Sequence, residues 1–186
     1  MNGLDEFFSN TRGLRQPEID WLLAQGVPAL ALAKDHGEIG FVIAASKVVF
    51  GDSHFDFADD DAEHGVAALI MVARDENGDV ADLVAWRPKD QLVAPYFNAV
   101  SLLGQHNVGS PRLGEPLLVH PGPLEWLRAA REGVVVLNPQ HAWAILADAG
   151  DLQAASVEHG LALREALQPP EISIVIPRNS KIQVAA

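Results

Sequence analysis

Residues 117–137 read LLVHPGPLEWLRAAREGVVVL, and this stretch decides the fold that we expect for the second half of the chain. Two short runs within it, Leu117–Val119 and Val134–Leu137, are wholly apolar, which is typical of strands buried on both faces. Between them, Gly122 and Pro123 mark a sharp turn into a helix, because proline suits the first helical position. The pattern predicts two parallel neighbouring strands joined by a helix, with Gly122 at the strand-to-helix turn.

Downstream, helix and strand continue to alternate. Asn138 can cap a helix that begins with proline, and Gly150 follows the end of that helix. Asp151 can cap a next helix, and a last apolar run, Ile172–Ile176, predicts a final strand. Residues 117–186 are therefore expected to form a small parallel, Rossmann-like βαβααβ unit. The apolar stripe of its last helix is Leu152, Ala155, His159, Leu163 and Leu167.

Upstream, residues 38–97 favour an antiparallel sheet. The runs Ala67–Arg74 and Val80–Trp86 flank a polar stretch in which Asn77-Gly78 supplies the positive φ angles of a tight hairpin turn. Two earlier runs, rich in β-branched and aromatic residues, are also predicted strands: Ile39–Ala44 and Lys47–Phe50.

The chain divides into three regions of different character. Residues 1–100 combine a helical lead-in, with Pro17 at a helix start, and the antiparallel sheet. Residues 101–116 are rich in glycine and proline and are predicted to be a linker, and residues 117–186 form the α/β unit. The expected fold class is therefore α/β, and α+β overall.

Composition narrows the classes of function. The chain has 186 residues, with 13 Lys plus Arg against 25 Asp plus Glu, and a formal net charge of −12. This charge repels nucleic acid and so disfavours direct nucleic-acid binding. The absence of cysteine excludes disulfides and cysteine-based zinc sites. With no recognisable signal peptide and no apolar stretch of the roughly 20 residues that span a bilayer, we expect a cytoplasmic location and no membrane partner.

Three pieces of the chain resemble, in the same order, the catalytic core of phage-type DNA primases. Leu117–Leu127 looks like the opening of a Toprim domain, in which a strand runs into Glu-Gly-x-x-Asp and a helix. Met71–Val80 resembles the hairpin that precedes the Toprim half, and Tyr96-Phe97-Asn98-Ala99 resembles the short run that follows this hairpin. The resemblance implies a phage or mobile-element origin and a sheet whose carboxyl edge holds Mg²⁺ for phosphoryl transfer.

The sequence departs from this family at the positions of the family's catalytic acidic residues. Aligned on Gly122, Pro121 takes the place of the catalytic Glu, and proline can neither ligate a metal nor move a proton. Glu125 falls on the next acidic position, and Asp148 with Asp151 has a different spacing from the family's Asp-x-Asp pair. These three carboxylates are the candidate catalytic residues. No metal or other cofactor is expected, except Mg²⁺ if they retain an acidic site.

Other residues are candidates for binding. On the same resemblance, the residues left to contact nucleotide or strand are Arg74, Arg87, Tyr96 and Asn98. Between residues 52 and 64, acidic and histidine side chains crowd together without the register of a calcium loop, which favours a solvated loop over a cation site or a phosphate-mimicking arm.

Three histidines can be weighed as well. His120 and His141 follow the first two strands of the predicted parallel sheet and could share a metal or act as acid and base. Two histidines without a paired carboxylate are more often ordinary surface residues. His159 lies on an apolar stripe and is predicted to be a core residue.

Three functions remain open, in order of preference. The first is a non-catalytic primase- or Toprim-like protein with an accessory or regulatory role in DNA replication. The second is an acidic protein-interaction module of unrelated function, whose partner is a basic protein. The third is a metal-dependent phosphotransferase or hydrolase built on the three candidate carboxylates.

Overall fold

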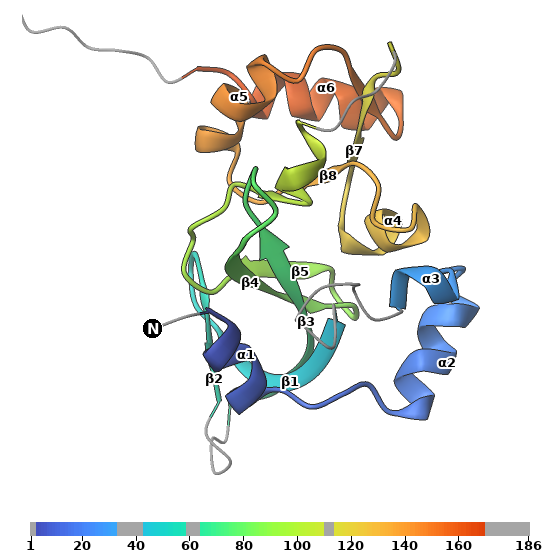
Figure 1. Cartoon of the computed structure of the whole chain (residues 1–186), viewed down its shortest axis with the longest axis vertical. Coiled ribbons are helices and arrows are strands. Elements are labelled where there is room, and N and C mark those ends of the chain that lie inside the picture. Colours follow the sequence, from blue (N-terminus) through green and yellow to red (C-terminus); the bar gives the residue numbers. More distant parts are fainter. Residues whose placement is uncertain (1–2, 33–42, 59–63, 110–113, 170–186) are drawn as a thin grey trace, which may run out of the picture.

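The computed structural model describes residues 3–32, 43–58, 64–109 and 114–169, in which the chain adopts an α+β fold. Two β-sheets lie one above the other in Figure 1, with helices at both ends of the molecule. The predicted strand Ile172–Ile176 lies outside the described residues.

The first sheet is antiparallel, with the strand order β2-β1-β3-β4-β5, which confirms the predicted antiparallel arrangement. The two predicted strands Ile39–Ala44 and Lys47–Phe50 are one continuous strand from Ile43 onward, and residues 39–42 lie outside the described residues. The predicted hairpin strands are its β3 and β4, and most of their residues are buried because alternate side chains pack into two different cores. β2 falls within the acidic run that was predicted to be a loop, since Phe55 anchors it in the core. The strands are β1 (Ile43–Phe50), β2 (Phe55–Phe57), β3 (Val66–Arg74), β4 (Val80–Arg87) and β5 (Leu92–Pro95).

The β3–β4 turn is longer than the predicted Asn-Gly turn. Only Gly78, at φ 86°, has a positive φ in this turn. Asp75 organises the turn instead, because its Oδ1 accepts hydrogen bonds from the backbone N–H groups of Asn77 (2.9 Å) and Asp79 (3.0 Å). A register shift between Ala73 and Arg74 accommodates the extra residue.

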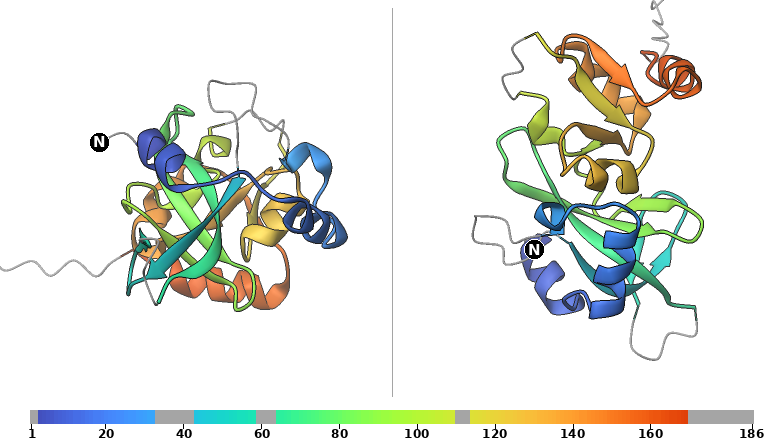
Figure 2. Two further views of the ribbon diagram at one scale, coloured as in Figure 1. Left: turned by 90° about the horizontal axis from the view of Figure 1, so that it is seen from below. Right: turned by 90° about the vertical axis from the view of Figure 1, so that its right-hand side faces the viewer.

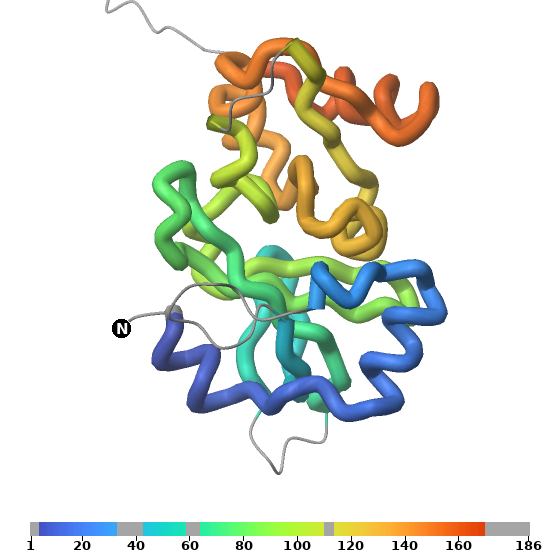
Figure 3. The backbone as a smooth tube through the Cα atoms, turned by 45° about the vertical axis from the view of Figure 1, so that its right-hand side comes forward, coloured from blue at the N-terminus to red at the C-terminus, as the bar shows by residue number. Residues whose placement is uncertain are grey.

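The described residues before the first sheet are mainly helical, as predicted, and form α1 (Gly3–Asn10), α2 (Gln16–Ala24) and α3 (Ala29–Leu32). Pro17 lies in the first turn of α2, and Gly26, at φ 84°, follows the end of that helix. Figure 3 shows these helices wrapping one side of the sheet, with the α2–α3 turn next to α4 (Pro123–Arg128) of the second half. The hydrogen bond from Arg128 Nε to Gln25 O, 2.6 Å long, joins the two segments.

The second sheet has the order β6-β8-β7-β9. β7 pairs in parallel with β8 and β9, and β6 pairs with β8 in the antiparallel direction. The parallel pair β7–β8 joined by α4, with Gly122 as the N-cap of that helix, confirms the prediction for residues 117–137. Its elements are β6 (Leu102–Leu103), η1 (Gln105–Asn107), β7 (Leu117–His120), α4 (Pro123–Arg128), β8 (Val134–Val136), α5 (Pro139–Ala147), β9 (Leu152–Ala154) and α6 (Val157–Ala166).

Two sequence predictions are wrong in this half. Leu152–Ala154 was assigned to a helix capped by Asp151, but it forms β9, because it pairs with Leu117–Val119 along the open edge of β7. The last helix starts later, with Ser156 Oγ accepting from His159 N–H as its cap. Leu102–Leu103 was assigned to a linker, but it forms β6, because both leucines are fully buried beside β8.

Side chains of β8 alternate between two cores. Val134 packs with Ala142 and Leu146 of α5 on the outer face. Val135 packs on the inner face with Trp126 and Leu127 of α4, in a core that continues through Leu103 to Trp86 and Leu22 of the first half. Figure 2 shows α4 between the two sheets, so the inner core belongs to both halves of the chain.

Candidate cleft between the two sheets

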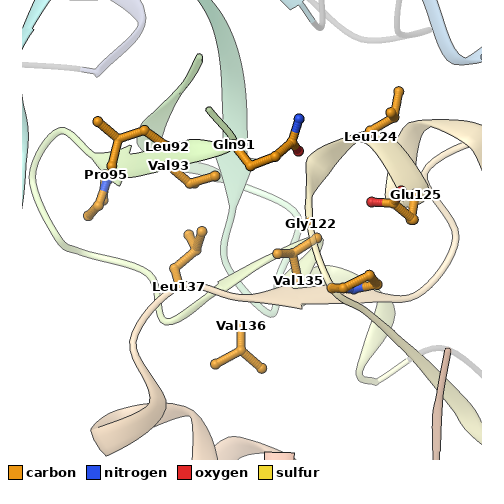
Figure 4. Close-up of a pocket in the computed structure, with 11 residues that line it drawn as sticks. Gln91, Leu92, Val93, Pro95, Gly122, Leu124, Glu125, Val135, Val136 and Leu137 are labelled. Atoms are coloured by element: carbon orange, nitrogen blue, oxygen red, sulfur yellow. The ribbon is translucent and has the colours of Figure 1, made fainter. Parts of the chain in front are cut away.

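The carboxyl edge of β7 and β8 faces β5, the edge strand of the first sheet. A cavity of about 650 Å³ lies between them (Figure 4). Its walls are mostly apolar, with Leu92, Val93 and Pro95 on one side and Pro121, Val135 and Leu137 on the other. A second cavity of about 560 Å³ shares Leu92, Val93, Pro95 and Leu137 with the first, so the two continue each other along β5. We call the combined feature the β5 cleft.

Gly122 forms the floor of the first cavity. Its φ of −170° is extended backbone that any residue can adopt, so the turn itself does not demand glycine. The space above Gly122 is open instead. A Cβ atom at this position would lie 3.6 Å from Glu125 Oε2 and 3.9 Å from Gln91 Oε1. Two acceptor oxygens, one from α4 and one from the loop before β5, therefore lie within 4 Å of the position that a Cβ would take on Gly122.

Gln91 is positioned by the loop that precedes β5. Its backbone is left-handed, at φ 58°, which is uncommon for a residue other than glycine. Its side-chain Nε2 donates to Pro88 O at 2.7 Å, and this bond fixes the amide so that Oε1 lies on the side of Gly122 (Figure 4). The strained residue thus presents an acceptor to the cleft.

The negative charge of Glu125 is only weakly balanced by a neighbouring cation. Arg128 Nη1 lies 3.4 Å from Glu125 Oε1, and both side chains are more than a third exposed. Because the Arg128 Nε–H is committed to Gln25 O, this contact is a weak surface ion pair of about 1 kcal/mol or less. Glu125 Oε2 accepts no hydrogen bond from the described residues and faces the cleft.

The structure does not bring the three candidate carboxylates together. Glu125 follows the carboxyl end of β7, whereas the backbone of Asp151 accepts from Leu117 N–H at 2.8 Å, at the amino end of the same strand. The three residue steps of β7 separate these edges by about 10 Å. Asp148 ends α5 on the Asp151 side and is exposed. These donors do not fit a shared Mg²⁺, and no group of three acidic or histidine side chains that could hold a metal occurs in the described residues.

Each of the three histidines forms a hydrogen bond with a nearby residue. His120 Nε2 donates to Glu132 O at 2.9 Å, and His141 Nδ1 accepts from Asn138 Nδ2 at 3.3 Å. His159 is half-buried rather than a core residue, because α6 has no buried position. Burial, and next the neighbouring His120, lower the pKa of His159.

The four predicted contact residues are dispersed. Arg74 donates to Gly78 O at 2.6 Å, whereas Arg87 pairs with Asp90 and lies over the Phe50 ring, 5.4 Å from its centroid. Arg74 ends β3 opposite Val80, the first residue of β4, whereas Arg87 is the last residue of β4, so the two arginines are roughly 23 Å apart over the seven residue steps of β4. They therefore do not share one strand-binding surface.

Tyr96 and Asn98 also face different surroundings. The Tyr96 ring packs with Phe55, Phe57 and Phe97, at centroid distances from 4.5 to 5.2 Å. Burial raises the pKa of its phenol, and the Glu6 and Asp56 carboxylates raise it further. Asn98, at φ 56°, lines the second cavity, so only this member of the four reaches the β5 cleft.

Sequence reasoning missed Asp82, which is fully buried in β4. Its Oδ1 accepts from the N–H groups of Tyr96 (3.2 Å) and Phe97 (2.8 Å), and its Oδ2 accepts from Ala99 N–H (2.7 Å). This carboxylate holds the loop between β5 and β6 in place. The available signal was a lone Asp inside an otherwise apolar strand.

The acidic run is only partly described, because residues 59–63 lie outside the described chain. Asp56 is 70% exposed in its side chain and stands 3.5 Å from His54 Nε2. Asp52 lines the second cavity. The run thus borders one end of the β5 cleft.

No protein-family model matches the sequence, and no curated protein matches it significantly. No helix within the described ranges has both the length and the apolar character needed to cross a membrane.

Proposed function

We propose that this chain is a Toprim-like protein of phage or mobile-element type that binds rather than catalyses, as an accessory or regulatory component of DNA replication. The resemblance of residues 66 to 176 to phage-type primases is the basis for the biological process. The parallel β7–Gly122–α4–β8 unit supports the Toprim likeness.

A single observation carries the binding role. At the carboxyl edge of β7 and β8, where a Toprim enzyme would need several carboxylates, Pro121 and apolar side chains surround Glu125, the one acid among the described residues that line this cavity. Asp148 and Asp151 stand at the opposite edge. Phosphoryl transfer by bound Mg²⁺ requires acidic ligands that converge, so this edge is suited to holding a partner.

Calorimetry and primer synthesis test this proposal together. We expect no heat of Mg²⁺ or Mn²⁺ binding, and no primer synthesis by the chain alone on a single-stranded template. When the chain is added to primase and helicase from the same replication system, the rate of primer synthesis should change. Glu132→Ala, on an exposed loop, is the control for Glu125→Ala. Metal-dependent synthesis by the chain alone that Glu125→Ala abolishes would refute the proposal, as would the absence of any effect on the reconstituted reaction.

A second candidate, an acidic protein-interaction module unrelated to replication, is favoured by the exposed Asp56 and the net charge of −12. Neutralising Asp52 and Asp56 to Asn should then weaken capture of a basic partner. Unchanged capture by this double variant would remove the candidate.

A further inference from the structure

We infer that the β5 cleft binds an extended segment of a partner protein, with a lysine or arginine side chain of that segment held between Glu125 and Gln91 above Gly122. This inference rests on the proposed binding role and adds the chemistry of the partner. The described residues supply three independent arguments for it.

The first argument is the pair of oxygens. A Cβ atom built on Gly122 would lie 3.6 Å from Glu125 Oε2 and 3.9 Å from Gln91 Oε1, so both oxygens border the open space beside Gly122. Both atoms are acceptors, one of them carries charge, and neither is opposed by a donor of the described chain. Such a pair suits the N–H groups of a cationic side chain, because hydrogen bonds between ionised partners are the strongest of their kind.

The second argument is the shape and apolar lining of the β5 cleft. Leu92, Val93 and Leu137 can cover the aliphatic stem of a lysine or arginine and the neighbouring apolar side chains of the segment. β5 is the last strand of its sheet, so its outer main-chain groups face no further strand in the described chain. An extended segment placed along such an edge gains main-chain hydrogen bonds as well as side-chain pockets.

The third argument is charge. The chain carries a net charge of −12, which attracts a basic segment over distances of about 10 Å and repels an acidic one. Asp52, which lines the second cavity, adds a negative charge at the other end of the β5 cleft. Arg128 opposes this field only in part, because its Nε–H is bound to Gln25 O.

Short fluorescein-labelled peptides test the inference on the full chain. The peptides alternate valine and threonine after a first residue that is lysine, arginine, glutamine or glutamate. We expect the lysine and arginine peptides to bind with a Kd about tenfold lower than the glutamine peptide, as measured by fluorescence anisotropy at low salt, and this preference should shrink at high salt.

Two variants test separately the charge of Glu125 and the open space beside Gly122. Glu125→Gln should abolish the preference for a cationic first residue. Gly122→Ala should do the same by placing a methyl group between the two oxygens, and its backbone can accept alanine without strain. Glu132→Gln, an exposed acid elsewhere, should leave the preference intact. Thermal melting of each variant verifies that it is folded.

The outcomes distinguish the two proposals. Equal binding of all four peptides would overturn the cation site while leaving a binding cleft in place. No binding of any peptide, with primer synthesis still altered by the chain, would overturn the inference and not the proposed function. Self-association that is lost in Glu125→Gln, without peptide binding, would overturn it in favour of a second copy of this chain.

Discussion

At the scale of single residues, buried or bonded carboxylates shape this protein more than its numerous exposed acids do. Asp82 is buried and accepts backbone hydrogen bonds from Leu83, Tyr96, Phe97 and Ala99. A carboxylate in this position replaces the water that these N–H groups would otherwise need. The loop that carries Asn98 into the β5 cleft therefore depends on one acid in β4.

Replacing Asp82 should destabilise the whole chain. In Asp82→Ala, the part-buried N–H groups of Phe97 and Ala99 lose their charged acceptor, whereas Tyr96 N–H keeps Leu83 O, so the free energy of unfolding should fall by about 2 kcal/mol or more. Urea denaturation measures this change. Asp79→Ala, an exposed acid of the neighbouring turn, should change the free energy by less than about 0.5 kcal/mol. Equal effects of the two substitutions would contradict the role of Asp82.

Glu18 should make stability depend on acid pH. Hydrogen bonds from Arg12, followed by the bond from Arg15 N–H, lower the pKa of Glu18 from 4.5 to about 2. Since the pKa is lower in the folded state, its stabilising contribution is complete above about pH 4.5 and is lost as the pH falls toward about 2.

Thermal melts of Glu18→Gln test this sign. At neutral pH, the free energy of unfolding of the wild type should exceed that of the variant by about 1 kcal/mol or less, because the Arg12–Glu18 ion pair is partly exposed. The difference should vanish near pH 2. Glu115→Gln, an exposed acid, should show no such pH dependence. A difference that grows on acidification would contradict the assignment.

At the scale of elements, the turn between α4 and β8 locks the parallel unit together. Gly133 has a φ of 75°, and a Cβ there would lie 2.4 Å from Leu118 O of β7. Its own carbonyl accepts from Trp126 Nε1 (3.2 Å) and Asn107 Nδ2 (2.8 Å). One residue thus joins α4, β7, β8 and η1.

Gly133→Ala should therefore be costly. The left-handed backbone alone costs an alanine roughly 1–2 kcal/mol, and the contact with Leu118 O forces β7 to move, so the total should exceed about 2 kcal/mol. Gly109→Ala has open space around it and no positive φ, so it should be close to neutral. Chemical denaturation of both variants provides the comparison, and a neutral Gly133→Ala would refute the close-packing argument.

At the scale of the whole molecule, the inner core ties the two sheets into one unit. Leu127 of α4 is fully buried in a cluster that also contains Trp86 and Met71 of the first sheet. Such sharing predicts that the sheets unfold together.

Leu127→Ala tests this coupling. Removing a buried leucine side chain should cost about 2–5 kcal/mol. Hydrogen exchange should rise both in β3–β4 and in β7–β8, within a single unfolding transition. Leu161→Ala, at a half-exposed position on α6, should leave both sheets protected. Faster exchange in β7–β8 alone would contradict the shared core.

Local chemistry made several elements predictable. Apolar runs and the backbone preferences of Pro and Gly predict the start of α2 at Pro17, the two strands of the β3–β4 hairpin and the β7–α4–β8 unit. The helix assigned from Asp151 was wrong because Leu152–Ala154 satisfies both a helical stripe and a short strand. Pairing with the edge of β7 stabilises this segment as a strand.

The sequence by itself determined the α+β class, the order of most elements and the proline beside Gly122, because these depend on neighbours along the chain. Only the tertiary structure decided that Gln91 and Glu125 both lie beside Gly122, that Asp151 stands at the far edge from Glu125, and that Asp82 holds the 96–99 loop. The physical reason is that such encounters arise from the packing of whole sheets and helices. That packing sums many weak contacts between residues far apart in the chain, and no local pattern records it.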